Sequence, residues 1–139
     1  VLASMNFPSF PTFTARTLMS DDLDLSRALV RAYNDFTIDE WCGEYPGRFI
    51  PMAVPMIWSP EETADEVRRC AAKGCHSLSF TENPAALGYP SFHDAYWDPF
   101  WRAAEVKPVP LVLVRVIPVV GLHAGSRTAR ANSMPTMMP

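Results

Sequence analysis

Polar side chains that could take part in chemistry follow a short strand-like segment that ends at Phe80. The sequence from residue 79 to residue 84 reads "SFTENP". Glu82 offers a carboxylate and Asn83 an amide, and both could contact a substrate if this loop lines a pocket. Pro84 restricts Asn83 toward extended geometry, so an ordinary turn is the alternative. His93 and Asp94 could form a second substrate-binding pair. The alternative there is that Asp94 caps a helix while His93 is exposed.

Two further positions are candidates from their place in the sequence. His123 lies in "GLHAGS" at 121–126 and is the best candidate metal ligand, although such a short tract can also arise by chance. One imidazole does not hold a catalytic metal ion, because these sites use about three protein ligands. Asn6 ends the first apolar segment and could face the same pocket as Glu82, or belong to a turn.

The elements that must position these residues alternate between strands and helices. Residues 1–6 predict a strand. A helix then starts near Ser20 with acidic residues in its first turn and runs to about Glu44. One apolar stripe marks this helix, formed by Leu25, Leu29, Tyr33 and Phe36. Residues 49–54 predict the next strand, in which Pro51 removes a backbone donor and predicts an unpaired or bulged position.

The clearest signal is a helix that begins at Ser59. Ser59-Pro60-Glu61-Glu62 is a capping box, in which Ser59 caps the helix and the Glu62 side chain is expected to reach back. Ala64, Val67 and Ala71 form its predicted buried stripe, and Lys73-Gly74 ends it. A strand over 75–80 follows, then a helix that starts in 94–99. The apolar tract 109–120 predicts one more possible strand.

This order, β-α-β-α-β-α-β, indicates parallel strands joined through helices. Right-handed crossovers allow either a doubly wound sheet or an arc of a (β/α) barrel. In the strand over 75–80, Leu78 and Phe80 share one face while Ser77 and Ser79 share the other. Small polar residues suit the inside of a barrel near a site better than a face covered by helices. We therefore predict a partial (β/α) TIM-barrel arc of about four parallel strands with an irregular C-terminal tail.

Composition excludes several classes of function. The 139 residues carry a net charge of −3, so there is no overall basic field to attract nucleic acid. The most apolar tract is interrupted by prolines and an arginine and is too short to span a bilayer. Three scattered cysteines and the lack of a secretion-signal pattern indicate a cytoplasmic protein with reduced thiols. The four tryptophans are most simply packing residues.

The charges are distributed unevenly along the chain. All 15 acidic residues lie at or before Glu105, and the segment 106–139 carries only basic charges. We therefore divide the chain into a partial barrel, 1–105, and a divergent tail rich in Pro, Arg and Met, 106–139.

Several segments together resemble the second amidohydrolase family, which includes relatives of amino-carboxymuconate-semialdehyde decarboxylase. The most specific are "RAYND", "PGRFIPM", "AAKG" and "ENPAALGYPSFHDAYWDPFW", within residues 1–105. The resemblance implies a TIM-barrel hydrolase or decarboxylase with a divalent metal (Zn, Mn or Fe). In the family the first strand supplies a His-x-His or Glu-x-His pair, the fifth a metal-binding His in a segment like "LHxGS", and the eighth an Asp that binds metal or moves a proton. This sequence has no His-x-His, and the residues 1–6, 49–54 and 76–80 would be the family's second, third and fourth strands.

The sequence departs from the family pattern after Glu105, where "GLHAGS" comes later than the pattern requires. Our hypothesis is a truncated copy whose reading frame changed near residue 105. Its parent enzyme would act on a small carboxylate or amide-like substrate, and this chain alone would be inactive. The alternative is a non-catalytic interaction module, because an incomplete barrel leaves strand edges open to self-association. A poorly folded gene product is the third possibility.

Overall fold

The computed structural model describes residues 1–6, 21–75, 77–106 and 111–114. Its strands are β1 (Ser4–Met5), β2 (Phe49–Ile50), β3 (Met52–Ala53), β4 (Ser77–Thr81) and β5 (Leu111–Val114). Its α-helices are α2 (Leu23–Asp35), α3 (Pro60–Ala72) and α4 (Asp98–Val106). A π-helix (Phe36–Trp41) and two 3-10 helices (Pro84–Leu87 and Ala95–Trp97) complete the described elements.

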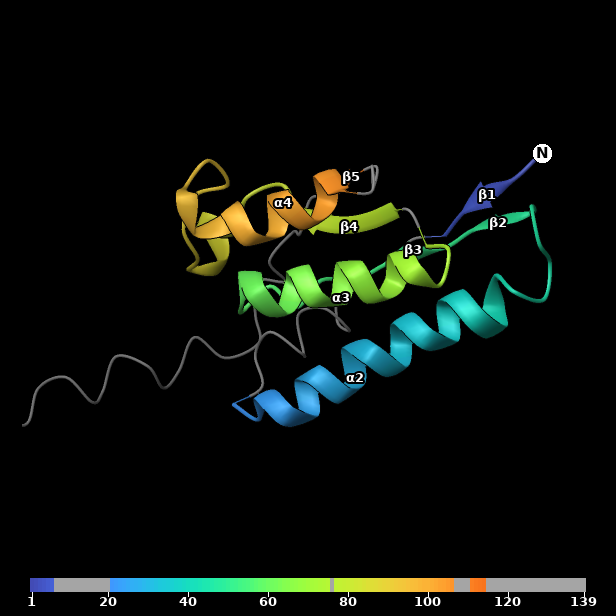
Figure 1. The fold of residues 1–139 in the computed structure, drawn as a ribbon, viewed down its shortest axis with the longest axis horizontal. Coiled ribbons are helices and arrows are strands. Elements are labelled where there is room, and N and C mark those ends of the chain that lie inside the picture. Colours follow the sequence, from blue (N-terminus) through green and yellow to red (C-terminus); the bar gives the residue numbers. More distant parts are fainter. Residues whose placement is uncertain (7–20, 76, 107–110, 115–139) are drawn as a thin grey trace, which may run out of the picture.

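The described strands form a two-stranded sheet, β1-β2, and a three-stranded sheet, β3-β4-β5, and every pair is parallel. β1 pairs with β2, β3 with β4, and β4 with β5. With right-handed crossovers, strands added successively in one direction place their connecting helices on one face. α2, α3 and α4 accordingly lie side by side as one helical layer (Figure 1). This arrangement is the predicted arc of a (β/α) barrel, since the strand order of a doubly wound sheet reverses at its switch point.

Pro51 separates two short strands, as its missing backbone N–H predicts. Before it, β2 pairs with β1; after it, β3 pairs with β4. The Pro51 carbonyl is still used, because it accepts a hydrogen bond from Ser77 Oγ at 2.7 Å. The segment 49–53 therefore connects the β1 edge to the rest of the arc. β5 lies in the tract where the sequence predicted one more strand.

α3 follows its sequence signals closely. Ser59 Oγ accepts from the Glu62 N–H at 3.2 Å, and Gly74 has the positive φ of 88° that follows a helix end. The three predicted stripe residues, Ala64, Val67 and Ala71, are buried. One detail was wrong: the Glu62 carboxylate does not reach back to the cap but binds Arg27 of α2.

The hydrophobic core lies between the strands and the helices α3 and α4. Leu78 and Phe80 of β4 face this core, and Ser77 and Ser79 lie on the opposite face of the strand, as predicted. The buried members of the cluster are Ile38, Ala53, Ile57, Ala64, Val67, Cys70, Cys75, Leu78, Phe80, Trp97, Phe100 and Ala103.

α2 differs from its prediction at both ends. Asp22 is its N-cap and accepts from Leu25 N–H at 2.9 Å, while Ser20 lies outside the described residues. The predicted helix to Glu44 instead changes at Asp35 into the π-helix, where the Cys42 N–H bonds the Thr37 carbonyl. A π-helix has no simple sequence signal, and such segments occur frequently at functional sites.

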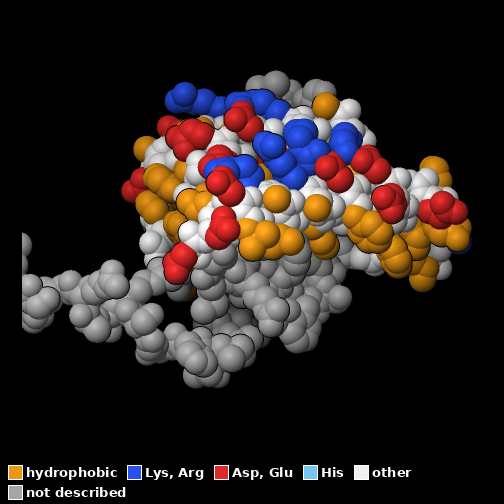
Figure 2. Space-filling model, turned by 90° about the horizontal axis from the view of Figure 1, so that it is seen from below, with side chains coloured by type: hydrophobic (Ala, Val, Ile, Leu, Met, Phe, Trp, Pro, Cys, Tyr) orange, Lys and Arg blue, Asp and Glu red, His pale blue; other side chains and the backbone are white. Residues whose placement is uncertain are grey.

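The apolar stripe of α2 does not face the core. Ser26, Val30 and Asn34 are buried instead, whereas Leu25 is 52% exposed and Leu29 is 40% exposed. Hydrophobic periodicity shows that a stripe exists but does not show which face packs on the rest of the fold. Charged side chains of α3 face α2, and so the polar side of α2 packs against α3. Figure 2 shows the resulting band of Lys and Arg side chains interspersed with Asp and Glu.

None of the helices in the described part of the chain is long and apolar enough to cross a membrane.

Candidate functional site

The loop that follows β4 lies beyond the carboxyl end of that strand (Figure 1). Thr81 ends β4, and its Oγ1 accepts from the Asn83 N–H at 3.2 Å. Asn83 Oδ1 in turn accepts from the Ala86 N–H at 3.3 Å and caps the 3-10 helix Pro84–Leu87. Asn83 thus forms the turn that the sequence allowed as an alternative, while its Nδ2 can still donate a hydrogen bond. Glu82, next to it, is exposed.

Aromatic packing supports this loop from below. The Phe80 ring lies 5.6 Å from the Phe92 ring and is stacked on Phe100 at 5.0 Å. Phe92 also packs against Trp101 at 4.7 Å. The indole N–H of Trp97 donates to the Pro90 carbonyl at 3.1 Å. Since both ends of the loop rest on one aromatic cluster, the loop presents its polar groups from a fixed base.

His93 follows Phe92 and is exposed. Asp94 accepts from the Tyr96 N–H at 2.8 Å and caps the 3-10 helix Ala95–Trp97. The arrangement is therefore the helix cap with an exposed histidine. His93, like Glu82 and Asn83, is exposed in the segment that joins β4 to α4.

Asn6 does not join this group. It follows β1, whose Met5 lies opposite Ile50, while Met52 lies opposite Ser77. By this register, Asn6 lies level with the position just before the first residue of β4. Glu82, by contrast, follows the last residue of β4. The whole of β4 lies between the two positions, which are therefore about 20 Å apart at the usual rise per residue. His76 and the predicted metal ligand His123 lie outside the described residues.

The described residues do not fit a catalytic divalent metal. No group of three or more His, Cys, Asp or Glu side chains in that part of the chain could hold one. Cys42, Cys70 and Cys75 are free and buried, and burial raises the pKa of each thiol. These thiols therefore stay protonated, as inert packing residues do, and we derive no metal-assisted step from the groups described.

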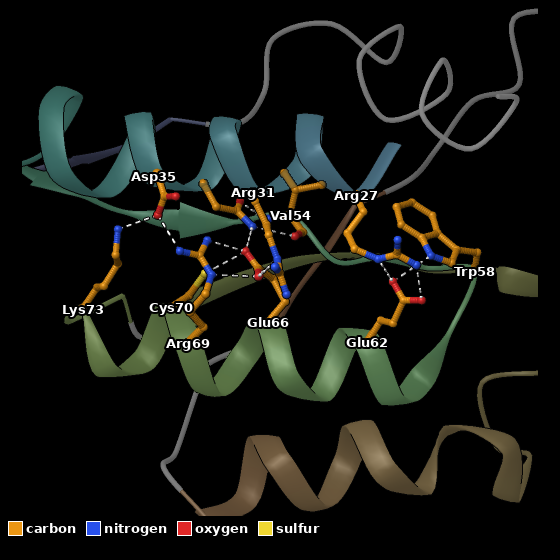
Figure 3. A network of polar contacts seen from close by, with 11 residues as sticks. Arg27, Arg31, Asp35, Val54, Trp58, Glu62, Glu66, Arg69, Cys70 and Lys73 are labelled. Carbon is orange, nitrogen blue, oxygen red and sulfur yellow. Dashed lines mark hydrogen bonds and ion pairs between the residues drawn. The ribbon is translucent and has the colours of Figure 1, made fainter. Parts of the chain in front are cut away.

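A polar network that joins α2, α3 and Val54, the residue after β3, was not foreseen from the sequence (Figure 3). Its centre is Glu66, whose side chain is 1% exposed. Arg69 binds both Glu66 oxygens, at 2.7 and 2.9 Å, and Asn34 Nδ2 donates to it at 2.8 Å. Asn34 also holds both backbone groups of Val54, donating to the carbonyl at 3.0 Å and accepting from the N–H at 2.8 Å.

The network continues along the two helices. Glu62 accepts from Arg27 at 2.9 and 2.8 Å and from the Trp58 indole at 3.2 Å. Asp35 accepts from Arg69 at 2.6 Å and also from Lys73. The contacts of Arg27, Asn34 and Asp35 join α2 to α3 and to Val54, so they fix the position of α2 in the arc.

These contacts set the protonation of the central carboxylate. Burial alone raises the pKa of Glu66, but the hydrogen bonds from Arg69 and Asn34 outweigh it and leave that pKa below its ordinary value. The pKa of Asp35 is lowered chiefly by Lys73, and that of Glu62 chiefly by Arg27. All three groups are thus charged at neutral pH.

The tryptophan prediction was partly wrong. Trp97 is fully buried and Trp101 packs on the core, but Trp41 is 48% exposed. Trp41 lines a surface pocket of about 320 Å³ at the end of the π-helix. The pocket was missed because its residues are brought together by that irregular helix rather than by a regular spacing.

Comparison with known proteins assigns most of this chain. A family model described as amidohydrolase matches residues 3–136 and so extends past residue 105, across the segment we assigned to a divergent tail. Among solved structures, the chain is similar to 5-carboxyvanillate decarboxylase from Novosphingobium aromaticivorans, at 28% identity and a TM-score of 0.61. That protein was solved with manganese and 3-methoxy-4-hydroxy-5-nitrobenzoic acid.

The match covers 70% of this chain and 27% of that one. A 2,6-dihydroxybenzoate decarboxylase from Rhizobium shares the fold, with 23% identity and a TM-score of 0.57 over 79% of this chain and 33% of that one. A 2,6-dihydroxybenzoate decarboxylase in complex with 2,6-dihydroxybenzoate gives identical values. This chain therefore spans about a third or less of the solved structures that it matches. A search of curated proteins finds no significant match.

Proposed function

Because the chain belongs to the amidohydrolase family, we propose that it supplies part of a metal-dependent decarboxylase or hydrolase barrel for a small aromatic carboxylate. The observation that carries the proposal is the fixed loop after β4, at the strand end where barrel enzymes collect their active-site residues. The similarity to decarboxylases of substituted benzoates suggests the substrate class.

Each of the three residues in this loop has a suitable role. Asn83 Nδ2 and the His93 imidazole can donate hydrogen bonds to a substrate carboxylate. The Glu82 carboxylate can accept from a phenolic hydroxyl. We keep Asn6 as a proposed substrate-contacting residue only for a form in which other strands complete the barrel, because its register sets it apart from the loop.

We further propose that this chain does not catalyse the reaction alone. The parent metal (Zn, Mn or Fe) needs about three protein ligands, and the described residues offer no such group. His123 stays our proposed ligand within "GLHAGS". We propose a cytoplasmic location on the basis of the three free cysteines.

Binding of 2,6-dihydroxybenzoate, followed by two-dimensional NMR of the full chain, tests the substrate site. We expect chemical-shift changes at the backbone amides of Glu82, Asn83 and His93, and weaker binding by about two- to tenfold in Glu82→Gln and His93→Gln. Glu105→Gln is the matched control, because Glu105 is an exposed carboxylate on α4. Shifts confined to other surfaces would contradict the assignment.

Metal content and carbon dioxide release test the proposal that this chain does not catalyse the reaction alone. The purified chain should carry well below one equivalent of metal and release no carbon dioxide from aromatic carboxylates with added Mn²⁺. One equivalent of Zn, Mn or Fe that is lost in His123→Ala, together with turnover, would show that the chain holds a complete site.

The interaction module is a second candidate, favoured by one observation. Within the described residues β5 pairs with β4 on one side only. A strand edge of this kind can pair with another chain.

A further inference from the structure

The pocket at the end of the π-helix combines aromatic rings with carboxylates. It is lined by Phe36, Glu40, Trp41, Glu44, Tyr45 and Phe49. Phe49 opens β2, so the pocket lies at the amino end of the strands, away from the loop that follows β4. Figure 2 shows hydrophobic and acidic side chains side by side at the end of the molecule where α2 finishes.

Among the four aromatic rings that line the pocket, Phe49 contacts two others. The Trp41 and Phe49 ring centres lie 5.8 Å apart with an interplanar angle of 37°. Tyr45 stands edge-on to Phe49 at 5.9 Å and 77°. Trp41 and Tyr45 are 48% and 57% exposed, so their rings are open to a ligand rather than consumed by the core.

The backbone that carries these rings is irregular, with a π-helix followed by a tight turn at Gly43. The hydrogen bond from Cys42 N–H to the Thr37 carbonyl is 3.0 Å long, and Phe36 and Trp41, the two end residues of the π-helix, line the same pocket. At Gly43 an added Cβ would lie 2.1 Å from the Asp39 carbonyl oxygen, so only glycine fits the turn that leads to Glu44 and Tyr45. This irregular segment interrupts the regular helix, and four aromatic rings line the pocket beside it.

The two carboxylates in the pocket differ from the others along these helices. Asp39, next to Glu40, pairs with Lys73, and Asp35 pairs with Lys73 and Arg69. Glu40 and Glu44 form no ion pair with any residue in 1–6, 21–75, 77–106 or 111–114. The faces of aromatic rings attract cations, and free carboxylates at the rim strengthen that attraction.

We propose that this pocket binds a small organic cation with a methylated or alkylated ammonium group. The rings would surround the apolar, positively charged head, and Glu40 and Glu44 would supply the opposite charge. A volume of about 320 Å³ suits a ligand of this size. This site is independent of the proposed carboxylate site, because it lies at the other end of the strands and carries the opposite charge preference.

Titration of the full chain with choline, at constant ionic strength, tests the proposal. The neutral comparison is 3,3-dimethyl-1-butanol, the analogue of choline in which a quaternary carbon replaces the nitrogen. We expect choline, and not the alcohol, to shift the Trp41 indole N–H signal in two-dimensional NMR. Trp41→Leu should weaken choline binding about threefold or more, and Glu44→Gln about two- to fivefold.

Two controls separate a lost site from a lost fold. Glu105→Gln removes an exposed carboxylate from α4 and should leave choline binding unchanged. Each variant should keep the far-UV circular dichroism of the parent chain. Equal binding of the alcohol, or unchanged choline binding in Trp41→Leu, would overturn the proposal. Indole shifts that follow protein concentration alone would also overturn it, by showing that a second copy covers the pocket.

Discussion

At the scale of single residues, the decisive group is one carboxylate without a catalytic role. Glu66 is nearly inaccessible, yet it is charged, because Arg69 and Asn34 satisfy it. Removing one partner of such a buried group costs far more than the pair contributes, since the other group is left desolvated. Sequence patterns did not indicate this, because Glu66 lies in a helix rich in charged residues whose side chains would ordinarily all face solvent.

We predict that Glu66→Gln lowers the free energy of unfolding by about 1–3 kcal/mol, because the neutral amide presents an N–H toward Arg69. Urea unfolding followed by circular dichroism measures the change. Glu105→Gln, exposed on α4, should change stability by less than about 0.5 kcal/mol. Equal effects of the two substitutions would mean that the network does not stabilise the fold.

Acid should weaken the same network. The pKa values of Glu66, Glu62 and Asp35 are lowered in the folded chain, so the folded state binds fewer protons than the unfolded state in the acidic range. Their stabilisation is therefore complete above the ordinary carboxyl pKa, about pH 4–4.5, and is lost as pH falls further. Glu66→Gln should show a shallower loss below that pH than the parent chain.

At the scale of elements, α2 is attached to the arc by charge and hydrogen bonds more than by apolar burial. Arg27, Arg31 and Asp35 of α2 face Glu62, Glu66 and Arg69 of α3. The apolar stripe of the same helix remains largely exposed. An interface of partly exposed ion pairs is weak and sensitive to salt, so α2 should open more readily than α3.

Hydrogen exchange of the α2 amides tests this view. Asp35→Asn removes pairs to Arg69 and Lys73 and should speed exchange in α2 by about two- to fivefold. Asp65→Asn is the matched control, because within the described residues Asp65 forms an ion pair only inside α3, with Arg68. If both variants exchange α2 at the parent rate, the ion pairs do not hold the helix.

At the scale of the whole molecule, the described strands form an arc and not a closed ring. Sequential parallel strands with helices on one face build a barrel only when enough units close it. The match covers 27% and 33% of the length of two solved decarboxylases, which agrees with such an arc. An arc also has edges, which closed barrels lack.

We predict that the chain associates with itself through those edges, so that its average mass in sedimentation velocity rises with concentration. The substitution Val112→Pro removes one backbone donor from β5 and should lower the association. Because Val112 is paired with Ser79 of β4, circular dichroism must show that the variant still folds. A mass that stays monomeric at every concentration would exclude the interaction module.

The sequence by itself determined the alternation of strands and helices, the cap and end of α3, the interruption at Pro51 and the family. These features depend on local rules, such as a serine cap, a glycine with positive φ or a missing backbone N–H, which act over a few residues. Only the tertiary structure decided which face of α2 is buried, where its regular helix ends and that Glu66 is enclosed. Those outcomes depend on what each helix meets across space: α3 presents charges to α2, so polar residues are buried there and an apolar stripe is not.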